Sequence, residues 1–324
     1  MTIAPPWAMS FASVELIIVK NLFIPMKHSV KDWVAVTRYW SFSVSAMPVV
    51  ATFAYLFWSH EPGSMLSLGK ALVALVGVVV LHAAGNVLSD YYDYKTGVDN
   101  EQAFAVPNLV FHKFEPKEYL VFSIVLFAIG VAIGLFLTWQ SGPVLLLIGG
   151  AGVVLTLLYS WLKYHALGDL DIFIIFAVLP VLGTSYVATG SIVWDALVLT
   201  LPFAFITVSV LHINNTIDIE SDRAAGMRSF AMLLGKKNSV ELYMAYQLLP
   251  FLCVVVAVAL RLLPWYALLC LVALIPASKN VKAARAWRTK GQEAILGLDQ
   301  ATAKLHLVFS LLLSVGLLVA AIVG

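Results

Sequence analysis

The segment Asn86-Val-Leu-Ser-Asp-Tyr-Tyr-Asp-Tyr-Lys-Thr-Gly-Val-Asp99 places three carboxylates and an amide at the end of a long apolar run. Asn86, Asp90 and Asp93 are spaced i, i+4 and i+7, so they share one face of a helix that continues out of that run. A carboxylate in apolar surroundings is costly unless a cation or hydrogen-bond donors face it. The pattern therefore predicts a helix that ends in a polar site.

A second segment, Asn214-Asn-Thr-Ile-Asp-Ile-Glu-Ser-Asp222, repeats the Asn-x-x-x-Asp spacing at the end of another apolar run. The dipeptide Leu-His precedes each segment, at residues 81–82 and 211–212. Two such acidic clusters repel each other, because unit charges ~4 Å apart at an effective dielectric of ~20 repel by about 4 kcal/mol. We expect a cation between them, and Mg²⁺ is the usual choice when phosphate is a further ligand.

Four carboxylates are the candidate metal ligands for two Mg²⁺ ions, with three neighbouring amides as neutral oxygen donors or ligand-orienting groups. The carboxylates are Asp90, Asp93, Asp218 and Asp222, and the amides are Asn86, Asn214 and Asn215. For either cluster alone, a solvated helix cap is the competing interpretation. For His82 and His212, we expect hydrogen bonds across helices.

Composition identifies the class of protein. The chain has 324 residues, of which 61% are hydrophobic and 12% charged, and its mean hydropathy is +0.92. These values predict a polytopic membrane protein. The net charge of +2 is too small to indicate nucleic acid binding. Cys253 and Cys270 lie inside apolar runs and are interpreted as small buried hydrophobic residues.

Nine segments are long and apolar enough to span a bilayer as helices, since about 20 such residues are needed. They are residues 39–59, 68–89, 120–138, 143–162, 171–190, 194–214, 240–260, 263–278 and 305–323. The predicted fold is an all-α bundle of about nine transmembrane helices around a central apolar cavity. Residues 1–30 form an N-terminal extension, for which an interfacial position is one option, and residues 31–324 form the nine-helix domain.

The basic residues give the orientation. All but two of the 20 Lys and Arg residues fall on one side of the predicted helices, and the exceptions are Lys70 and Arg261. The richer side is cytoplasmic by the positive-inside rule. The N-terminus and both acidic clusters are thus predicted to face the cytoplasm, and the C-terminus the outside. The basic segment 279–288, around Trp287, is interpreted as a headgroup contact.

Three stretches resemble the UbiA superfamily of membrane aromatic prenyltransferases, and within it the menaquinone-pathway (1,4-dihydroxy-2-naphthoate) branch. They are residues 86–99, residues 214–226 (Asn-Asn-Thr-Ile-Asp-Ile-Glu-Ser-Asp-Arg-Ala-Ala-Gly), and residues 159–169 (Tyr-Ser-Trp-Leu-Lys-Tyr-His-Ala-Leu-Gly-Asp). The resemblance covers nearly everything after residue 30. It implies a prenyltransferase that moves a polyprenyl group from a polyprenyl diphosphate to an aromatic acceptor and releases diphosphate. The lipid bilayer is the further partner that we expect, and we expect no nucleic acid.

The resemblance also implies roles for particular residues. Lys163 would steady the diphosphate, Tyr159 would offer its ring to an allylic cation, and Asp169 would act near the acceptor as a base or orienting group. Arg38, Arg223 and Arg228 would assist with the diphosphate. A plain interfacial aromatic remains an equal interpretation of Tyr159.

The chain also departs from the family pattern. Ser89, Ile217, Met227 and Leu233 stand where many members have polar or basic residues, which weakens several expected diphosphate contacts. Two other functions therefore stay open beside the enzyme. One is a cation-coupled transporter, because paired intramembrane acidic motifs also occur in transporters. The other is a relative that binds isoprenoid without turnover.

We predict from the distribution of basic residues that the end of the last helix lies outside the cytoplasm. A reporter enzyme that works only in the cytoplasm, fused after Gly324, should be inactive. The same reporter inserted beside Lys117, in a predicted cytoplasmic loop, is the positive control. Cytoplasmic activity of the fusion at Gly324 would overturn the orientation.

Overall fold

The computed structural model describes residues 28–60, 66–99 and 108–323, and within them it is almost entirely helical. The first half comprises α2 (Val30–Val36), η2 (Tyr39–Ser41), α3 (Ser43–Ser59), α4 (Leu68–Thr96), α5 (Pro116–Ser141), α6 (Val144–Tyr164), α7 (Gly168–Phe173), η3 (Ile174–Val178) and α8 (Leu179–Thr189). The second half comprises η4 (Trp194–Leu199), α9 (Thr200–Ile217), α10 (Ile219–Ala224), α11 (Phe230–Ala259), η5 (Trp265–Ala273), α12 (Leu274–Arg285), α13 (Trp287–Lys290), η6 (Gly291–Ala294) and α14 (Leu298–Val323). Most of the predicted extension, including its apolar piece at residues 14–25, lies outside the described residues.

The predicted set of membrane-spanning helices is confirmed. In the described ranges, nine helices are long and apolar enough to cross a membrane, and each overlaps one of the nine predicted segments. Several are longer at the end that carries the acidic motifs. The second span continues to Thr96, the seventh begins at Phe230, and the ninth begins at Leu298. Apolar runs predict only the part of a helix inside the hydrocarbon core, so these polar extensions escaped the sequence analysis.

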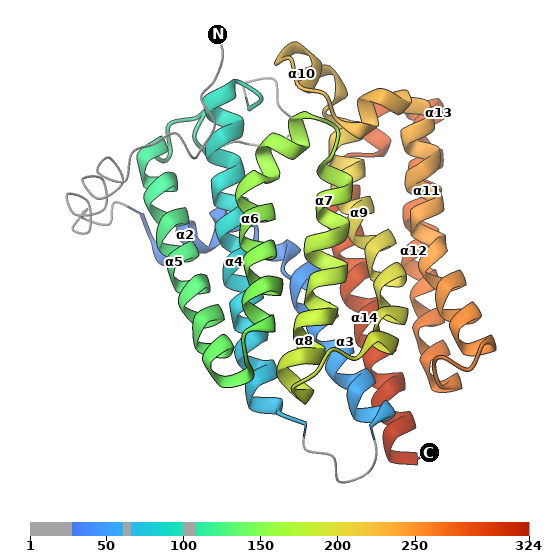
Figure 1. The fold of residues 1–324 in the computed structure, drawn as a ribbon. Helices are drawn as coiled ribbons and strands as arrows, with labels where there is room; N and C mark the ends of the chain where they lie inside the picture. Colours follow the sequence, from blue (N-terminus) through green and yellow to red (C-terminus); the bar gives the residue numbers. More distant parts are fainter. Residues whose placement is uncertain (1–27, 61–65, 100–107, 324) are drawn as a thin grey trace.

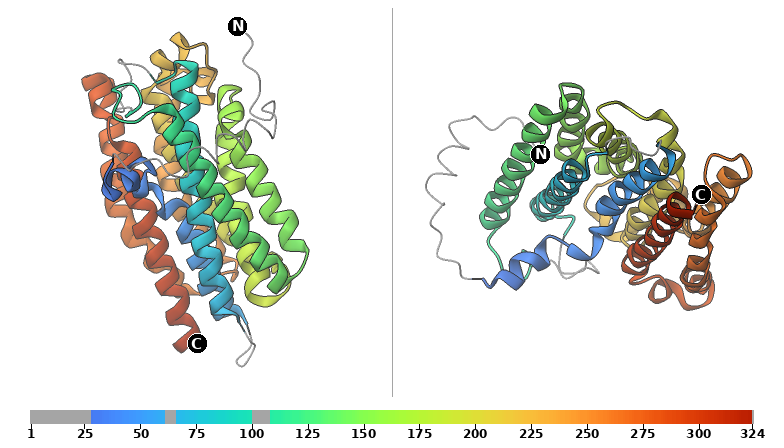
Figure 2. Two further views of the ribbon diagram at one scale, coloured as in Figure 1. Left: turned by 90° about the vertical axis from the view of Figure 1, so that its left-hand side faces the viewer. Right: turned by 90° about the horizontal axis from the view of Figure 1, so that it is seen from below.

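The helices stand side by side as one bundle, with α5 and α6 at one edge and α11 and α12 at the other (Figures 1 and 2). Helix α14 contacts α3, α9 and η5. The end of α4 and the short helix α10 lie at the same end of the bundle, opposite the end of α14 (Figure 1). Both acidic motifs therefore open toward one end of the bundle.

The fifth and eighth spans are not regular α-helices. The fifth changes to a π-helical turn, η3, before Pro180 starts the next α-helical turns. Proline has no N–H to donate to the preceding turn, and π-turns often mark functional positions. The eighth span begins as the 3₁₀ segment η5 and becomes α-helical only at Leu274. Ile175 and Phe176 in the π-turn line cavities, so the irregularity in the fifth span borders the interior space.

An apolar cavity is present, but it lies toward the edge of the bundle formed by α5 and α6 rather than at its centre. It has a volume of about 360 Å³ and lies among α4, α5, α6, η3 and α8. Its lining is mostly aliphatic and includes several glycines, such as Gly130 and Gly152, which have no side chain. Such a cavity suits a flexible hydrocarbon chain.

We predict that Gly316→Ala destabilises the bundle. A Cβ at Gly316 would lie 2.2 Å from the carbonyl oxygen of Tyr266, and main-chain atoms cannot move aside cheaply. Overpacking of this kind costs about 1–3 kcal/mol, so the melting temperature in detergent should fall. Gly134→Ala is the matched control, because no heavy atom lies within 4 Å of its Cβ position. Equal melting temperatures for the two variants would contradict this account of the α14–η5 contact.

Candidate functional site

The first acidic motif lies on one helix, as its spacing predicts. Asn86, Asp90 and Asp93 all belong to α4, which ends only at Thr96 with Gly97 in the left-handed conformation that favours glycine. Asp93 is buried, with 3% of its surface exposed. The motif is thus held inside the bundle on a rigid element.

Two cations neutralise the first motif. The guanidinium of Arg38 forms an ion pair with Asp90. Nζ of Lys163 donates to Oδ2 of Asp93 at 3.0 Å, and the Tyr164 hydroxyl donates to Oδ1 of the same carboxylate at 2.8 Å. Lys163 is only 8% exposed. A buried charge pair of this kind is stable only when both members are present, because removing one leaves an uncompensated buried charge.

Arg38 reaches this site from an unusual backbone conformation. Its φ angle is 55°, in the left-handed region that non-glycine residues rarely adopt. The Nδ2 group of Asn86 donates to the carbonyl of Thr37 at 2.9 Å and to the hydroxyl of Ser41 at 3.3 Å. These bonds tie α4 to the α2–η2 turn. Asn86 therefore serves in part to hold the turn that presents Arg38.

The second motif lies at the junction of α9 and α10. Asp218 ends α9, and the carbonyl of Asp218 accepts the N–H of Asp222 at 2.8 Å. Oδ1 of Asp218 and Oδ2 of Asp222 are buried and have no hydrogen-bond partner among the described residues. Burial raises the pKa of Asp218 to about 6 and that of Asp222 to about 7, while nearby Lys163 opposes both shifts. The second motif thus presents carboxylate oxygens without a counter-charge of their own.

The four candidate metal ligands do not come together as one ready-made cluster. Within residues 28–60, 66–99 and 108–323, no group of three or more His, Cys, Asp or Glu side chains is arranged to hold one metal ion. Asp90 and Asp93 are instead engaged by Arg38 and Lys163. The oxygens of Asp218 and Asp222 are the part of the predicted set that has no ion-pair partner among the described residues.

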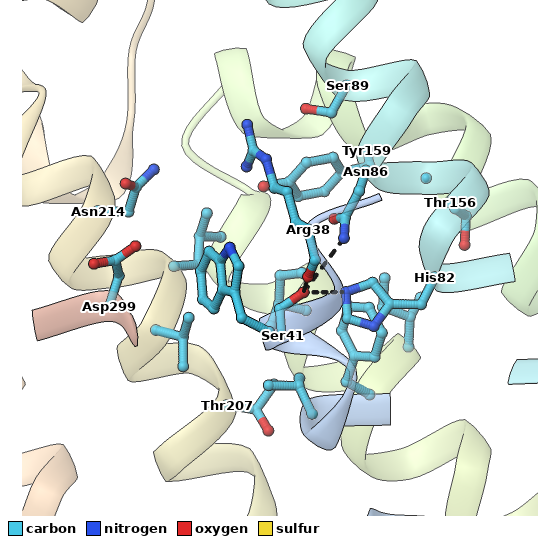
Figure 3. A pocket seen from close by; sticks show the side chains of 18 residues that line it. Arg38, Ser41, His82, Asn86, Ser89, Thr156, Tyr159, Thr207, Asn214 and Asp299 are labelled. Atoms are coloured by element: carbon cyan, nitrogen blue, oxygen red, sulfur yellow. Dashed lines mark hydrogen bonds between the residues drawn. The ribbon is translucent and has the colours of Figure 1, made fainter. Parts of the chain in front are cut away.

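A second pocket, of about 120 Å³, is lined by polar and apolar side chains together, and the predicted residues Arg38, Asn86, Tyr159 and Asn214 all line it (Figure 3). We call it the polar pocket, because it carries more polar side chains than the apolar cavity. Trp40, Ser41, Ser89, Thr207 and Asp299 also contribute to its wall. Four residues line both this pocket and the apolar cavity: His82, Thr156, Ile175 and Phe176. The two spaces therefore meet, one polar and one apolar.

Nine of the thirteen predicted site residues are absent from the lining of the pocket. Five of them, Asp90, Asp93, Asp218, Asp222 and Lys163, belong to the contacts described above, and the other four are Asp169, Arg223, Arg228 and Asn215. Asp169 accepts a hydrogen bond from Nδ1 of His212 at 2.9 Å, which links α7 to α9. Arg223 is exposed and lies 3.8 Å from Glu220. Arg228 is exposed, and its main chain bonds to Tyr164. Asn215 is buried away from the pocket. These four residues are on the elements that frame the site rather than in its wall.

The two histidines make the expected hydrogen bonds between helices. Nδ1 of His82 lies 3.0 Å from the hydroxyl of Ser45, and its Nε2 lies 3.3 Å from that of Ser41. His212 pairs with Asp169 as described above. Both imidazoles therefore connect helices around the pocket.

The sequence analysis missed three residues at the site. Tyr164 donates to Asp93 and directly follows Lys163 in the chain. Its position next to a predicted site residue was a signal that could have found it. Trp40 lies two residues after Arg38 and lines the same pocket. Asp299 was treated as loop, because the apolar run of the last helix starts several residues later. An acidic residue one or two turns before such a run was the signal that could have found it.

Sequence comparison finds relatives along most of the chain. The frog (Xenopus tropicalis) UbiA prenyltransferase domain-containing protein 1 is 36% identical over 232 residues, covering 70% of this chain and 65% of that protein. The rat (Rattus norvegicus) protein of the same name is 33% identical over 296 residues, covering 89% of this chain and 84% of its own.

Solved structures share the fold. A UbiA homologue from Aeropyrum pernix K1 in its apo form has a TM-score of 0.61 at 19% identity, covering 87% of this chain and 98% of its own. A UbiA homologue from Archaeoglobus fulgidus bound to GPP and Mg²⁺ has a TM-score of 0.52 at 12% identity, covering 87% and 99%. The model of the UbiA prenyltransferase family matches residues 46–308. The chain is therefore a multi-pass membrane enzyme of the UbiA prenyltransferase family.

Proposed function

We propose that this enzyme transfers a polyprenyl group from a polyprenyl diphosphate to an aromatic quinone precursor of the 1,4-dihydroxy-2-naphthoate type, as in menaquinone biosynthesis. The observation that carries the proposal is the junction of a polar pocket, bordered by two acidic motifs, with an apolar cavity. A molecule with a charged head and a hydrocarbon tail fits this pair of spaces. The Archaeoglobus homologue is described as bound to such a molecule, GPP, together with Mg²⁺.

Asp218 and Asp222 are the residues best suited to hold Mg²⁺, with Asp90 and Asp93 facing them from α4. The fit rests on oxygens of Asp218 and Asp222 that are buried without partners, and on the preference of Mg²⁺ for carboxylate oxygen. When Mg²⁺ is bound, its charge favours departure of the diphosphate. Because Arg38 and Lys163 already neutralise Asp90 and Asp93, they are in position to bind phosphate oxygens when the carboxylates take another partner.

The proposed reaction starts with cleavage of the C1–O bond of the polyprenyl diphosphate, whose electron pair leaves with diphosphate. Lys163 and Arg38 hold the growing negative charge. Tyr159, in the wall of the pocket, faces the allylic cation with its ring. A ring carbon of the acceptor then forms the new C–C bond to C1. The proton on that carbon passes to a diphosphate oxygen, which restores aromaticity and balances the reaction.

A cation-coupled transporter fits the structure less well than this reaction. Alternating access requires a site that opens to both sides of the membrane. Both acidic motifs lie at the same end of the bundle (Figure 1), and the interior space beyond them is apolar. A site open to one side and backed by an apolar cavity suits a lipid-tailed substrate.

The direct test is product formation by the purified full-length protein in detergent. We expect geranyl diphosphate and 1,4-dihydroxy-2-naphthoate to give a prenylated product by mass spectrometry and stoichiometric diphosphate, both dependent on Mg²⁺. A panel of other phenolic acceptors tests the assignment of the acceptor. Failure to release diphosphate with any acceptor would refute the proposed function.

We predict that Lys163→Met slows diphosphate release in a single turnover by about 10²–10³-fold, the usual effect of losing a fixed donor to developing oxyanion charge. Lys117→Met is the matched control, because Lys117 lies in the first turn of α5 and, unlike Lys163, forms no ion pair with an acidic motif among the described residues. Equal rates for the two variants would show that Lys163 is only one of many basic residues at this membrane surface.

We also predict that Mg²⁺ binding weakens as the pH falls through about 7. Burial raises the pKa values of Asp218 and Asp222 to about 6 and about 7, so below this range a proton must leave before the cation binds. Without Mg²⁺, the raised pKa values also make the protein less stable as the pH rises from about 4 to 7. Mg²⁺ should therefore raise the melting temperature much more at pH 8 than at pH 6.

The variant Asp222→Asn should show a smaller Mg²⁺-dependent rise in melting temperature at pH 8. Asp32→Asn is the control, because Asp32 pairs with Lys113 outside the pocket. A rise in melting temperature that is the same at both pH values would contradict the role of these carboxylates as proton-coupled ligands.

A further inference from the structure

The polar side chains in the wall of the pocket fall into two groups. On the side of η2 and α4, every labelled polar side chain has a partner. Arg38 pairs with Asp90, Ser41 and Asn86 bond to the turn before η2, and Ser89 donates to Asp93. The side formed by α9 and α14 differs. In the described part of the chain, Thr207, Asn214 and Asp299 have no side-chain hydrogen bond or ion pair (Figure 3).

Thr207 is the most deeply buried of the three unpartnered side chains on the side formed by α9 and α14. Its residue is 1% exposed, and its hydroxyl is buried without a partner among the described residues. Leaving a buried hydroxyl unsatisfied is unfavourable. Figure 3 shows Thr207 and Asn214 toward opposite ends of the pocket, with Asp299 between them in height. A polar ligand along this wall would satisfy groups that the protein leaves unpaired.

Asp299 is held firmly in this wall. It lies in the first turn of α14. The start of α14 is held by contacts to two other elements, and the segment before it is held by a third contact. The hydroxyl of Ser43 in α3 donates to the carbonyl of Ala303 at 3.1 Å. The hydroxyls of Tyr243 in α11 and Thr302 are 2.7 Å apart. Gln292, just before α14, donates to the carbonyl of Ile217 at 2.7 Å. A carboxylate on such a fixed turn is preorganised to accept a hydrogen bond.

The chemistry of an aromatic acceptor matches the polar side chains on the side of the pocket formed by α9 and α14. An aromatic carbon attacks an allylic cation readily only when a ring hydroxyl supplies electron density. A carboxylate that accepts the hydroxyl hydrogen increases that density, and hydrogen bonds to charged groups are the stronger ones. Trp40 lines the same pocket and offers an aromatic surface for offset stacking. The side of the pocket with partnered residues is already assigned to the diphosphate.

We propose that Asp299, with Thr207 and Asn214, forms the subsite for the aromatic acceptor, and that Asp299 accepts a hydrogen bond from a ring hydroxyl. This inference rests on the proposed function and adds the residues that recognise the acceptor. Asp299 and Thr207 lie outside both acidic motifs, and Asn214 begins the second one. Asp299 is thereby a specificity residue that selects hydroxylated rings over their ethers.

The test uses the full-length protein in detergent, with geranyl diphosphate and either 1,4-dihydroxy-2-naphthoate or its methyl ethers. We expect Asp299→Asn to lower kcat/KM for the hydroxylated acceptor about 10- to 100-fold, the effect of losing a hydrogen bond to a charged group. The KM for geranyl diphosphate should not change. Asp299→Glu, which keeps the carboxylate, should recover part of the loss.

The methyl ethers separate recognition from a structural effect. The wild-type enzyme should prefer the free hydroxyl, and Asp299→Asn should lose most of that preference, because the ether cannot donate to Asp299 in either protein. Glu293→Gln is the matched control, since Glu293 is exposed and outside the pocket. An unchanged preference in Asp299→Asn would overturn the assignment. A wild-type enzyme that releases diphosphate without prenylating any aromatic acceptor would instead refute the proposed function, and the inference with it.

Discussion

The ion pair between Lys163 and Asp93 is the interaction on which the site depends. Both groups are buried, at 8% and 3% exposure, and each would be costly alone in this apolar bundle. The pair joins α4 to α6 and fixes the distance between the first acidic motif and the loop that follows α6. Because Tyr164 also donates to Asp93, the end of α6 is held by two successive residues. Among the described residues, Asp218 and Asp222 of the second motif form no such pair, which is why they are the proposed ligands of a cation.

Much of this arrangement was predictable from the sequence, because the membrane imposes strong rules. Apolar length gave all nine spans, and the i, i+4, i+7 spacing placed Asn86, Asp90 and Asp93 on one helix. The extensions of α4, α11 and α14 were not predicted, because they are helical but too polar to be recognised by an apolar run. Asp299 belongs to such an extension. Hydropathy therefore does not identify the polar residues at the ends of membrane helices as helical.

The partners of the acidic residues were harder to predict than their positions. The sequence indicated that the carboxylates need positive charge, and the structure shows Arg38 and Lys163 supplying it to the first motif. Arg38 reaches Asp90 only because its backbone adopts a left-handed conformation supported by Asn86. Asp169 pairs with His212, a contact between α7 and α9 that was not predicted. Neither choice of partner can be derived from spacing, because both depend on how separate helices pack.

The junction between the polar pocket and the apolar cavity limits where chemistry can occur. His82, Thr156, Ile175 and Phe176 border both spaces, and the last two belong to the π-turn of the fifth span. A substrate with its head between the acidic motifs and its tail in the cavity must place its C–O bond close to this junction. The imidazole of His82 is already satisfied by two serine hydroxyls, so it has little capacity to attack a cation there. A bonded histidine, a threonine and two apolar side chains make a border with few free nucleophiles, which suits an allylic cation that must survive until the proposed aromatic acceptor reaches it.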